Sequence, residues 1–218
     1  MALASPDTVC YLSGMRKSFP DKIPSQPETR SKVAGLLVLS MVLSMVLSTV
    51  VFTGCVSDPE DPDRILTSNH YTNKVIGFDF AFPATWLAKL DQTFGNTKVD
   101  VVVAAPPRNN FSSNLNLIIS PHSGPAAMQE ILPMLESAIK GQTLDAAGYT
   151  ASIGTIDGKE VGRIDYESSV SGNLLHFSML VFINNNKDVV VTLTDRAEDF
   201  PTNTGIAAIK ASFHIIPK

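Results

Sequence analysis

A long run without any charged residue divides this chain into two unequal parts. Residues 33–53 read VAGLLVLSMVLSMVLSTVVFT, which is 21 positions without a charged side chain. The 32 residues before the run are net positive, with five basic side chains against three acidic ones. A positive segment followed by an apolar run is typical of a secretory signal. Because positive charge stays on the cytoplasmic side, we expect everything after Thr53 to be exported.

The apolar run ends at a cysteine that follows small residues. Residues 51–55 read VFTGC, and this string resembles a lipoprotein signal, the lipobox, although Phe52 stands where leucine is usual. The resemblance implies a signal peptide over 1–54 and a mature chain that begins at Cys55 with lipid on its sulfur. Acyl chains of that kind hold a protein firmly at a membrane surface. The implied location is extracytoplasmic, at the outer face of the cell membrane or at an outer membrane.

An uncleaved membrane anchor is the alternative reading of the same run. Twenty-one helical residues at about 1.5 Å each would cross a bilayer core of about 30 Å. Ser40, Ser44 and Ser48 recur at every fourth position and would form a small-residue stripe on such a helix. Translation from Met15 instead of Met1 is also open, since Met15-Arg16-Lys17 is the more ordinary start of a signal. Both readings place the C-terminal part outside the cytoplasmic membrane.

The charge balance and the cysteine count exclude several classes of protein. The 218-residue chain has a net charge of −4, and residues 55–218 hold 12 basic and 18 acidic side chains, which gives 12 − 18 = −6. An acidic domain is not expected to bind nucleic acid. The two cysteines, Cys10 and Cys55, cannot build a disulfide-rich scaffold or a thiolate zinc site. Residues 55–70 are acidic around two prolines and predict an extended, solvated tether.

Residues 71–218 are predicted to form an α+β domain. Strands are expected at 75–82, 98–105, 114–120, 149–156, 160–168, 174–183 and 188–194, from period-2 alternation and β-branched content. Asp157-Gly158 between two of them is a strong hairpin signal, and Asn or Gly fills the next two turns. Apolar residues at helical spacing predict helices at 125–140, with Pro133 as a kink or as its first turn, and at 204–211. Successive hairpins with separate helices indicate an antiparallel sheet flanked by helices.

Several local strings resemble the PsbP-like superfamily, which includes PsbP-related, DcrB-like and LpqN-like prokaryotic lipoproteins. Its opening strand of the kind gf-f-yP-W is matched by residues 77–86, GFDFAFPATW. Its late strand and its end near Ser-Phe are matched by residues 189–194 and by Ser212-Phe213. The resemblance covers about residues 71–216. It implies an α/β/α sandwich around an antiparallel sheet, and mostly non-catalytic accessory or binding roles.

Motifs that carry chemistry are few. The chain has no HExxH, GxSxG, P-loop or GxGxxG string, and the four histidines lack zinc-site spacing. The weak candidates for a Ca²⁺ or Mn²⁺ site are three carboxylates beside Arg196 and one loop histidine: Asp195, Glu198, Asp199 and His122. Asp165 and Glu167 are expected on one sheet face, as its solvated side, and His176 as a half-buried structural residue. Trp86 is expected to anchor the core.

These observations predict a lipid-anchored extracytoplasmic protein without a catalytic site or a cofactor. Its partners would be the membrane, through Cys55, and a membrane protein complex that contacts a binding or accessory domain. The alternative is a lipoprotein that binds a small ligand or a metal ion. A hydrolase is the least favoured of the three possibilities.

Overall fold

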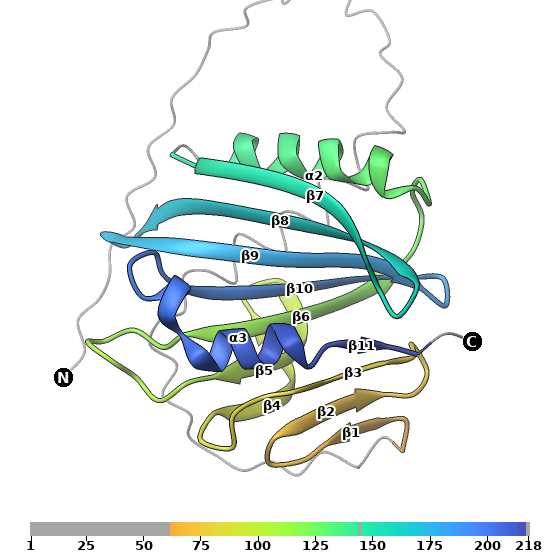
Figure 1. Ribbon diagram of the computed structural model, residues 1–218, viewed down its shortest axis with the longest axis horizontal. Helices are drawn as coiled ribbons and strands as arrows, with labels where there is room; N and C mark the ends of the chain where they lie inside the picture. The colour runs from red at the N-terminus through yellow and green to blue at the C-terminus, as the bar shows by residue number, and fades with distance from the viewer. Residues whose placement is uncertain (1–61, 144, 217–218) are drawn as a thin grey trace, which may run out of the picture.

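A computed structural model describes residues 62–143 and 145–216 of the chain. The predicted signal peptide over 1–54, the lipobox and Cys55 lie outside these residues. No helix in the described part of the chain is long and apolar enough to cross a membrane. The elements follow one another as strands, a helix, strands and a second helix, and a short strand closes the chain (Figure 1).

Seven strands form a large antiparallel sheet in the order β4-β5-β6-β10-β9-β8-β7. Their bounds are β4 Leu87–Phe94, β5 Thr97–Ala104, β6 Asn114–Pro121, β7 Ala147–Ile156, β8 Lys159–Val170, β9 Asn173–Asn184 and β10 Lys187–Arg196. Six of them confirm strands expected from the sequence. β4 is not predicted from the sequence, because its leucines, lysine and aspartate do not alternate cleanly between apolar and polar residues.

A second, four-stranded sheet has the order β1-β2-β3-β11, also antiparallel. Its strands are β1 Arg64–Leu66, β2 His70–Asn73, β3 Phe78–Ala81 and β11 His214–Ile215. β1 lies within the range 55–70 that was predicted as a tether, so folded structure begins N-terminal to residue 71. The expected strand over 75–82 is shorter than predicted, because residues 74–77 form a turn in which Gly77 has φ +83°.

The predicted meander is confirmed by its turns. β7 and β8 are joined by Asp157 at φ +49° and Gly158 at φ +78°, the left-handed pair that a two-residue hairpin requires. Asn185 and Asn186 adopt the same region between β9 and β10. Asparagine reaches this conformation at a lower cost than most residues, so the polar turns set the register of β7 to β10.

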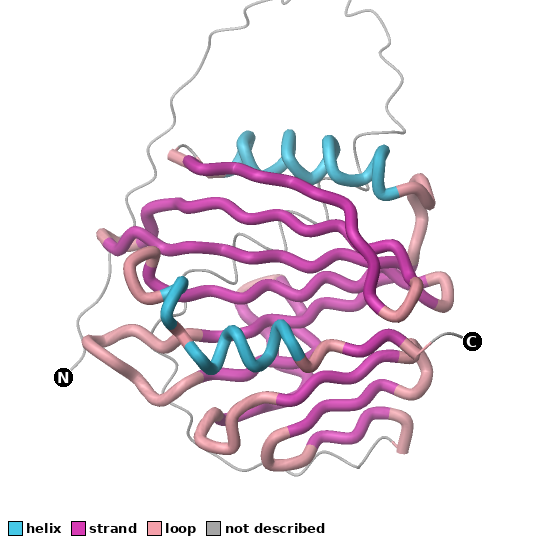
Figure 2. The backbone as a smooth tube through the Cα atoms, in the orientation of Figure 1, coloured by secondary structure: helices cyan, strands magenta, loops and turns pink. Residues whose placement is uncertain are grey.

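The two faces of the large sheet are covered differently (Figures 1 and 2). Helix α2, Met128–Gln142, buries Leu132, Leu135 and Ile139 against one face. Helix α3, Thr204–Ala211, packs with the small sheet against the other face in a core rich in phenylalanine. The predicted sandwich of one sheet between helices is therefore right for α2, but the opposite layer combines α3 with a second sheet.

Both predicted helices are present. α3 has the expected bounds, it buries Ile206 and Ile209, and Phe213 is buried just after it. α2 begins at Met128, whose backbone N–H donates to Glu160 on β8 at 3.1 Å in the absence of a side-chain cap on Ala127. Pro133 is exposed inside the helix rather than in its first turn, which excludes the first-turn reading.

Candidate functional site

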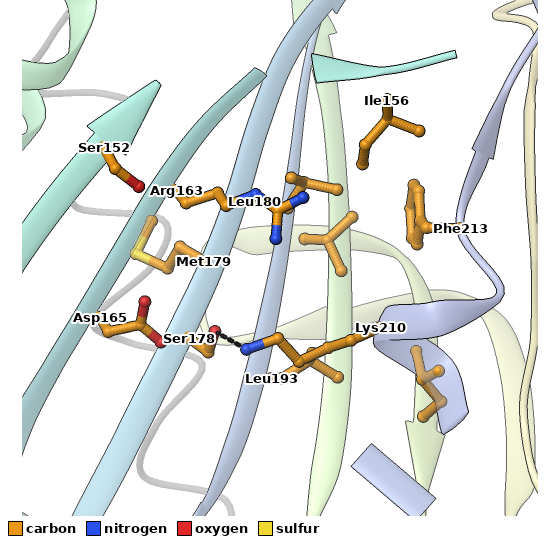
Figure 3. Close-up of a pocket in the computed structure, with 12 residues that line it drawn as sticks. Ser152, Ile156, Arg163, Asp165, Ser178, Met179, Leu180, Leu193, Lys210 and Phe213 are labelled. Atoms are coloured by element: carbon orange, nitrogen blue, oxygen red, sulfur yellow. Dashed lines mark hydrogen bonds between the residues drawn. The ribbon is translucent and has the colours of Figure 1, made fainter. Parts of the chain in front are cut away.

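A groove of about 110 Å³ opens between α3 and strands β7, β8 and β9 (Figure 3). It exists because α3 has only eight residues and covers the middle of the large sheet. Its deeper lining is apolar, and its polar lining comes from four strand residues and one helix residue. The apolar lining includes Ile156, Leu180, Val191, Leu193, Ile209 and Phe213, and the polar lining is Ser152, Arg163, Asp165, Ser178 and Lys210.

Two cations face each other across this groove. Arg163 on β8 and Lys210 on α3 point into it from opposite sides in Figure 3. Lys210 Nζ donates to Oγ of Ser178 at 3.0 Å and lies 5.6 Å from the ring centroid of Phe200. The side chain of Arg163, by contrast, makes no hydrogen bond or ion pair with any other residue in the described ranges. The groove therefore contains one positioned cation and one uncompensated cation.

The predicted pair of carboxylates lies at the border of the groove. Asp165 and Glu167 share a face of β8, as expected, and His176 of β9 is paired with Glu167 in the register. His176 Nε2 lies 3.4 Å from Asp165 and its Nδ1 lies 3.6 Å from Glu167. Its ring also contacts Phe200, with centroids 4.0 Å apart. His176 is thus partly buried among protein groups, as predicted, and Asp165 is turned toward it.

A second hollow of about 530 Å³ surrounds the end of β10. Asp195 is 2 % exposed there. Its Oδ1 accepts the backbone N–H of Arg196 at 2.8 Å, and its Oδ2 accepts Nδ2 of Asn203 at 2.6 Å. The predicted cation ligand is therefore occupied by protein donors. Asp199 also lines the hollow, whereas Glu198 is exposed and lies 4.0 Å from Arg196.

The predicted candidates are not brought together. His122 directly follows β6, and its Nδ1 lies 2.7 Å from Oδ1 of Asp188 near the start of β10, whereas Asp195 lies near the other end of β10. Within residues 62–143 and 145–216, no group of three or more His, Cys, Asp or Glu side chains is placed to hold a metal ion. The structure therefore gives the cation hypothesis for Asp195, Glu198, Asp199 and His122 no common centre.

Trp86 is part of the packed core, as predicted from the sequence. Trp86 is 7 % exposed and its ring lies against Gly205 in the first turn of α3, where a Cβ on Gly205 would come within 2.7 Å of the ring.

The groove residues Arg163, Ser178 and Lys210 were not predicted from the sequence as site residues. Arg163 precedes Asp165 by two positions on β8, so strand alternation alone could have placed both side chains on the same face of the sheet. The approach of Lys210 from α3 depends on tertiary packing.

The comparisons with known proteins give information about the fold of this chain. No protein-family model matches the chain, and no curated protein matches it. The solution structure of cyanobacterial PsbP, CyanoP, from Synechocystis sp. PCC 6803 matches at 19 % identity and a TM-score of 0.51, covering 75 % of this chain and 98 % of that one.

Two further solved structures are similar with lower TM-scores. LpqN, involved in cell envelope biogenesis of Mycobacterium tuberculosis, matches at 16 % identity and a TM-score of 0.46, over 64 % of this chain and 83 % of that one. A Pseudomonas aeruginosa protein of unknown function matches at 15 % identity and a TM-score of 0.48, over 64 % of this chain and 91 % of that one. The match to CyanoP confirms a PsbP-like fold for this chain, as the sequence resemblance implied.

Proposed function

We propose that this chain is a lipid-anchored extracytoplasmic protein whose PsbP-like domain is a non-catalytic binding module for a membrane protein. An extended segment of the partner would add a strand to the free edge of β7. The open edge of β7 is the observation that carries this proposal. The lipobox at Cys55 supports the anchor, and the fold supports an accessory role by analogy with the lipoproteins that the sequence resembles.

β7 is a ten-residue edge strand without a charged side chain. It pairs with β8 alone among the described strands, and most of its residues are exposed. The hairpin at Asp157 and Gly158 makes Ile156 and Lys159 a hydrogen-bonded pair. Because pairs alternate in an antiparallel ladder, Ala151, Ile153 and Thr155 direct their N–H and C=O groups outward. This row is a template for one further strand.

Edge strands usually carry features that prevent such pairing. The opposite edge strand, β4, shows two of them: it carries Lys89 and Asp91, and Asp91 has φ +50°, which interrupts the regular ladder. β7 carries neither charge nor proline, and Ile153 is 40 % exposed. β7 has an irregularity only at its start, where the register shifts between Ala147 and Thr150 and Gly148 has φ +62°, whereas residues 150–156 pair regularly with β8. The contrast between this regular segment and β4 favours β7 as a surface that is covered in the assembled state.

The position of β7 suits an anchored protein. The seven steps from Cys55 to Pro62 reach at most about 25 Å in extended form. Lipid on Cys55 would therefore hold the β1 side of the domain close to the membrane. β1 and β7 lie at opposite ends of the molecule in Figure 1. The β7 edge would then face away from the bilayer, toward the exported part of a membrane-protein partner.

Photo-crosslinking in the native host tests the proposal. A photoreactive amino acid at Ile153 should give one dominant membrane-protein adduct after detergent extraction, identified by mass spectrometry. The matched control places the same residue at Leu87, which is 60 % exposed at the start of β4. The mass of the N-terminal peptide from the same sample reports lipidation of Cys55.

The outcomes separate the parts of the proposal. An adduct at residue 153 that is absent at residue 87, together with a lipidated Cys55, supports it in full. The same adducts from both positions, or none from either, would refute docking at β7. An N-terminal peptide that extends through residues 33–53 would replace the lipid anchor with an uncleaved one and leave the test of β7 unaffected.

A further inference from the structure

The groove under α3 has the form of a binding site rather than of an incompletely packed core. Leu180, Val191 and Leu193 line it, flanked by Ile156 of β7 and Phe213 after α3. Apolar strand residues that open to a groove lined by charged groups offer a water-excluding surface for an apolar ligand group. At about 110 Å³ the groove is smaller than the cavity of about 150 Å³ that holds benzene in an engineered protein. It therefore suits about four or five carbon atoms.

The lining of the groove selects for negative charge. Arg163 and Lys210 contribute two positive charges, and Asp165 contributes one negative charge. The side chain of Asp165 lies 3.4 Å from His176 rather than within ion-pair distance of Arg163. Arg163 is exposed, and no described residue accepts from the five N–H donors of its guanidinium, so these donors face solvent. A ligand carboxylate would replace water as their acceptor and bring the net charge of the groove to zero.

Lys210 is held where a second donor is needed. Its ammonium group donates to Ser178, which is 6 % exposed, so the long side chain is fixed across the groove. Two of its three N–H donors are not used by that bond. Because Arg163 approaches from β8 and Lys210 from α3, an anion between them would be bound from two sides (Figure 3).

We propose that this groove binds a small organic carboxylate with a short branched or linear apolar tail. The carboxylate lies between Arg163 and Lys210, and the tail lies on Leu180, Val191 and Leu193. The same chemistry is present in a free short-chain acid and in a peptide that ends in an apolar residue. Ser152 and Ile156 of β7 belong to the groove lining, but the carboxylate position lies between Arg163 of β8 and Lys210 of α3 and uses no β7 residue. Binding of the acid therefore does not require the partner proposed above.

Isothermal titration of the full-length chain in detergent with isovalerate tests this site, against matched micelles without protein. We expect saturable one-to-one binding in the low-millimolar range or tighter. Isovaleramide keeps the tail without the charge and acetate keeps the charge without the tail, so each should bind at least about tenfold more weakly. These ligand comparisons use the wild-type chain alone and do not depend on any variant folding.

Variants then locate the site. Arg163→Gln and Lys210→Gln should each weaken isovalerate binding about tenfold or more, since each removes a charge-assisted hydrogen bond. Lys159→Gln is the matched control, because it removes an exposed cation from the same strand outside the groove lining. It should change the affinity less than about threefold. N-acetylleucine identifies the source: tighter binding than isovalerate indicates a peptide end, and weaker binding indicates a free acid.

The proposal is overturned by any of three results. The first is no saturable binding of isovalerate up to about 10 mM. The second is equal binding of isovaleramide, which would show that the cations take no part. The third is an equal loss in Lys159→Gln and Arg163→Gln, which would assign the effect to the general field of the domain.

Discussion

Asn203 Nδ2 donates to Oδ2 of Asp195 at 2.6 Å, and this contact connects the end of β10 to the start of α3. The same Nδ2 group donates to Oγ of Ser113 at 3.1 Å, next to β6. The amide oxygen of Asn203 accepts the backbone N–H groups of Gly205 and Ile206, so it caps α3. One side chain thus satisfies a buried carboxylate and a helix terminus at once.

Asn203→Ala should destabilise the domain by about 2–4 kcal/mol. Loss of the helix cap accounts for about 1 kcal/mol, and the unpaired oxygen on buried Asp195 accounts for about 1–3 kcal/mol. Urea unfolding followed by far-UV circular dichroism measures the change. In an Asp195→Ala background the same substitution should cost only about 1 kcal/mol, because only the cap is then lost. Additive costs would show that the two side chains are not coupled.

Much of the fold could be predicted from local sequence signals. The Asp157-Gly158 turn, the asparagines after β9, the alternation of β8 and the apolar, β-branched content of β9 and β10 specify a meander with little help from distant residues. The small sheet could not be predicted in the same way. β1 has three residues and β11 has two, and each is stabilised by pairing with a neighbour rather than by its own propensity.

The candidate site was only partly predictable. Alternation along β8 correctly places Asp165 and Glu167 on one face, but the position of Lys210 depends on the packing of α3 over the sheet. The cation site was predicted from carboxylates that lie close together in the sequence. Asp195 is turned inward to Asn203, whereas Glu198, three residues later, is exposed after the strand has ended. Spacing in a sequence does not predict such divergence.

Gly162→Ala should weaken the packing of α2 on the large sheet. A Cβ on Gly162 would lie 2.7 Å from Cδ2 of Leu132 and 3.2 Å from Sδ of Met128. Overpacking of this kind typically costs about 1–3 kcal/mol, and thermal unfolding measures the change. Leu132→Val in the same chain should recover part of the loss, because it removes the overlapping methyl group.

Gly154→Ala on β7 is the matched control for that prediction. The nearest atom to its Cβ would be Nε of Arg163 at 3.6 Å, which is ordinary contact. It should therefore be neutral or slightly stabilising, since alanine loses less backbone entropy than glycine on folding. Equal losses at Gly154 and Gly162 would contradict a steric origin.

His122→Ala should destabilise the domain by about 1–3 kcal/mol, because it leaves buried Asp188 without its 2.7 Å partner. His214→Ala is the comparison: His214 has a side chain that is 62 % exposed and lies 3.3 Å from Asp157, so its loss should cost less than about 0.5 kcal/mol. Urea unfolding of both variants decides the matter. A neutral His122→Ala would reopen a role for this histidine other than a structural one.

Asp91 should give the domain an acid-sensitive contact between the two sheets. Burial acts to raise the pKa of this carboxyl, but hydrogen bonds and charge from Lys98 and Arg64 outweigh it and lower the pKa below its usual value. Lys98 Nζ and Arg64 of β1 each lie 3.0 Å from the carboxylate. A lowered pKa in the folded state means that the ionised form stabilises the fold above the unfolded-state pKa of about 4. That contribution is lost as the pH falls through the lower, folded-state pKa.

Asp91→Asn should therefore lower the stability at pH 7 by about 0.2–1 kcal/mol, as is usual for partly exposed ion pairs. Asparagine tolerates the left-handed backbone at this position, so no backbone strain is added. The difference from wild type should shrink progressively below about pH 4, where the native aspartate also becomes protonated. Melting temperatures from pH 2 to 7 measure this, with Asp199→Asn at an exposed position expected to leave the profile unchanged. A difference that stays constant through acid pH would show that Asp91 acts through its shape rather than its charge.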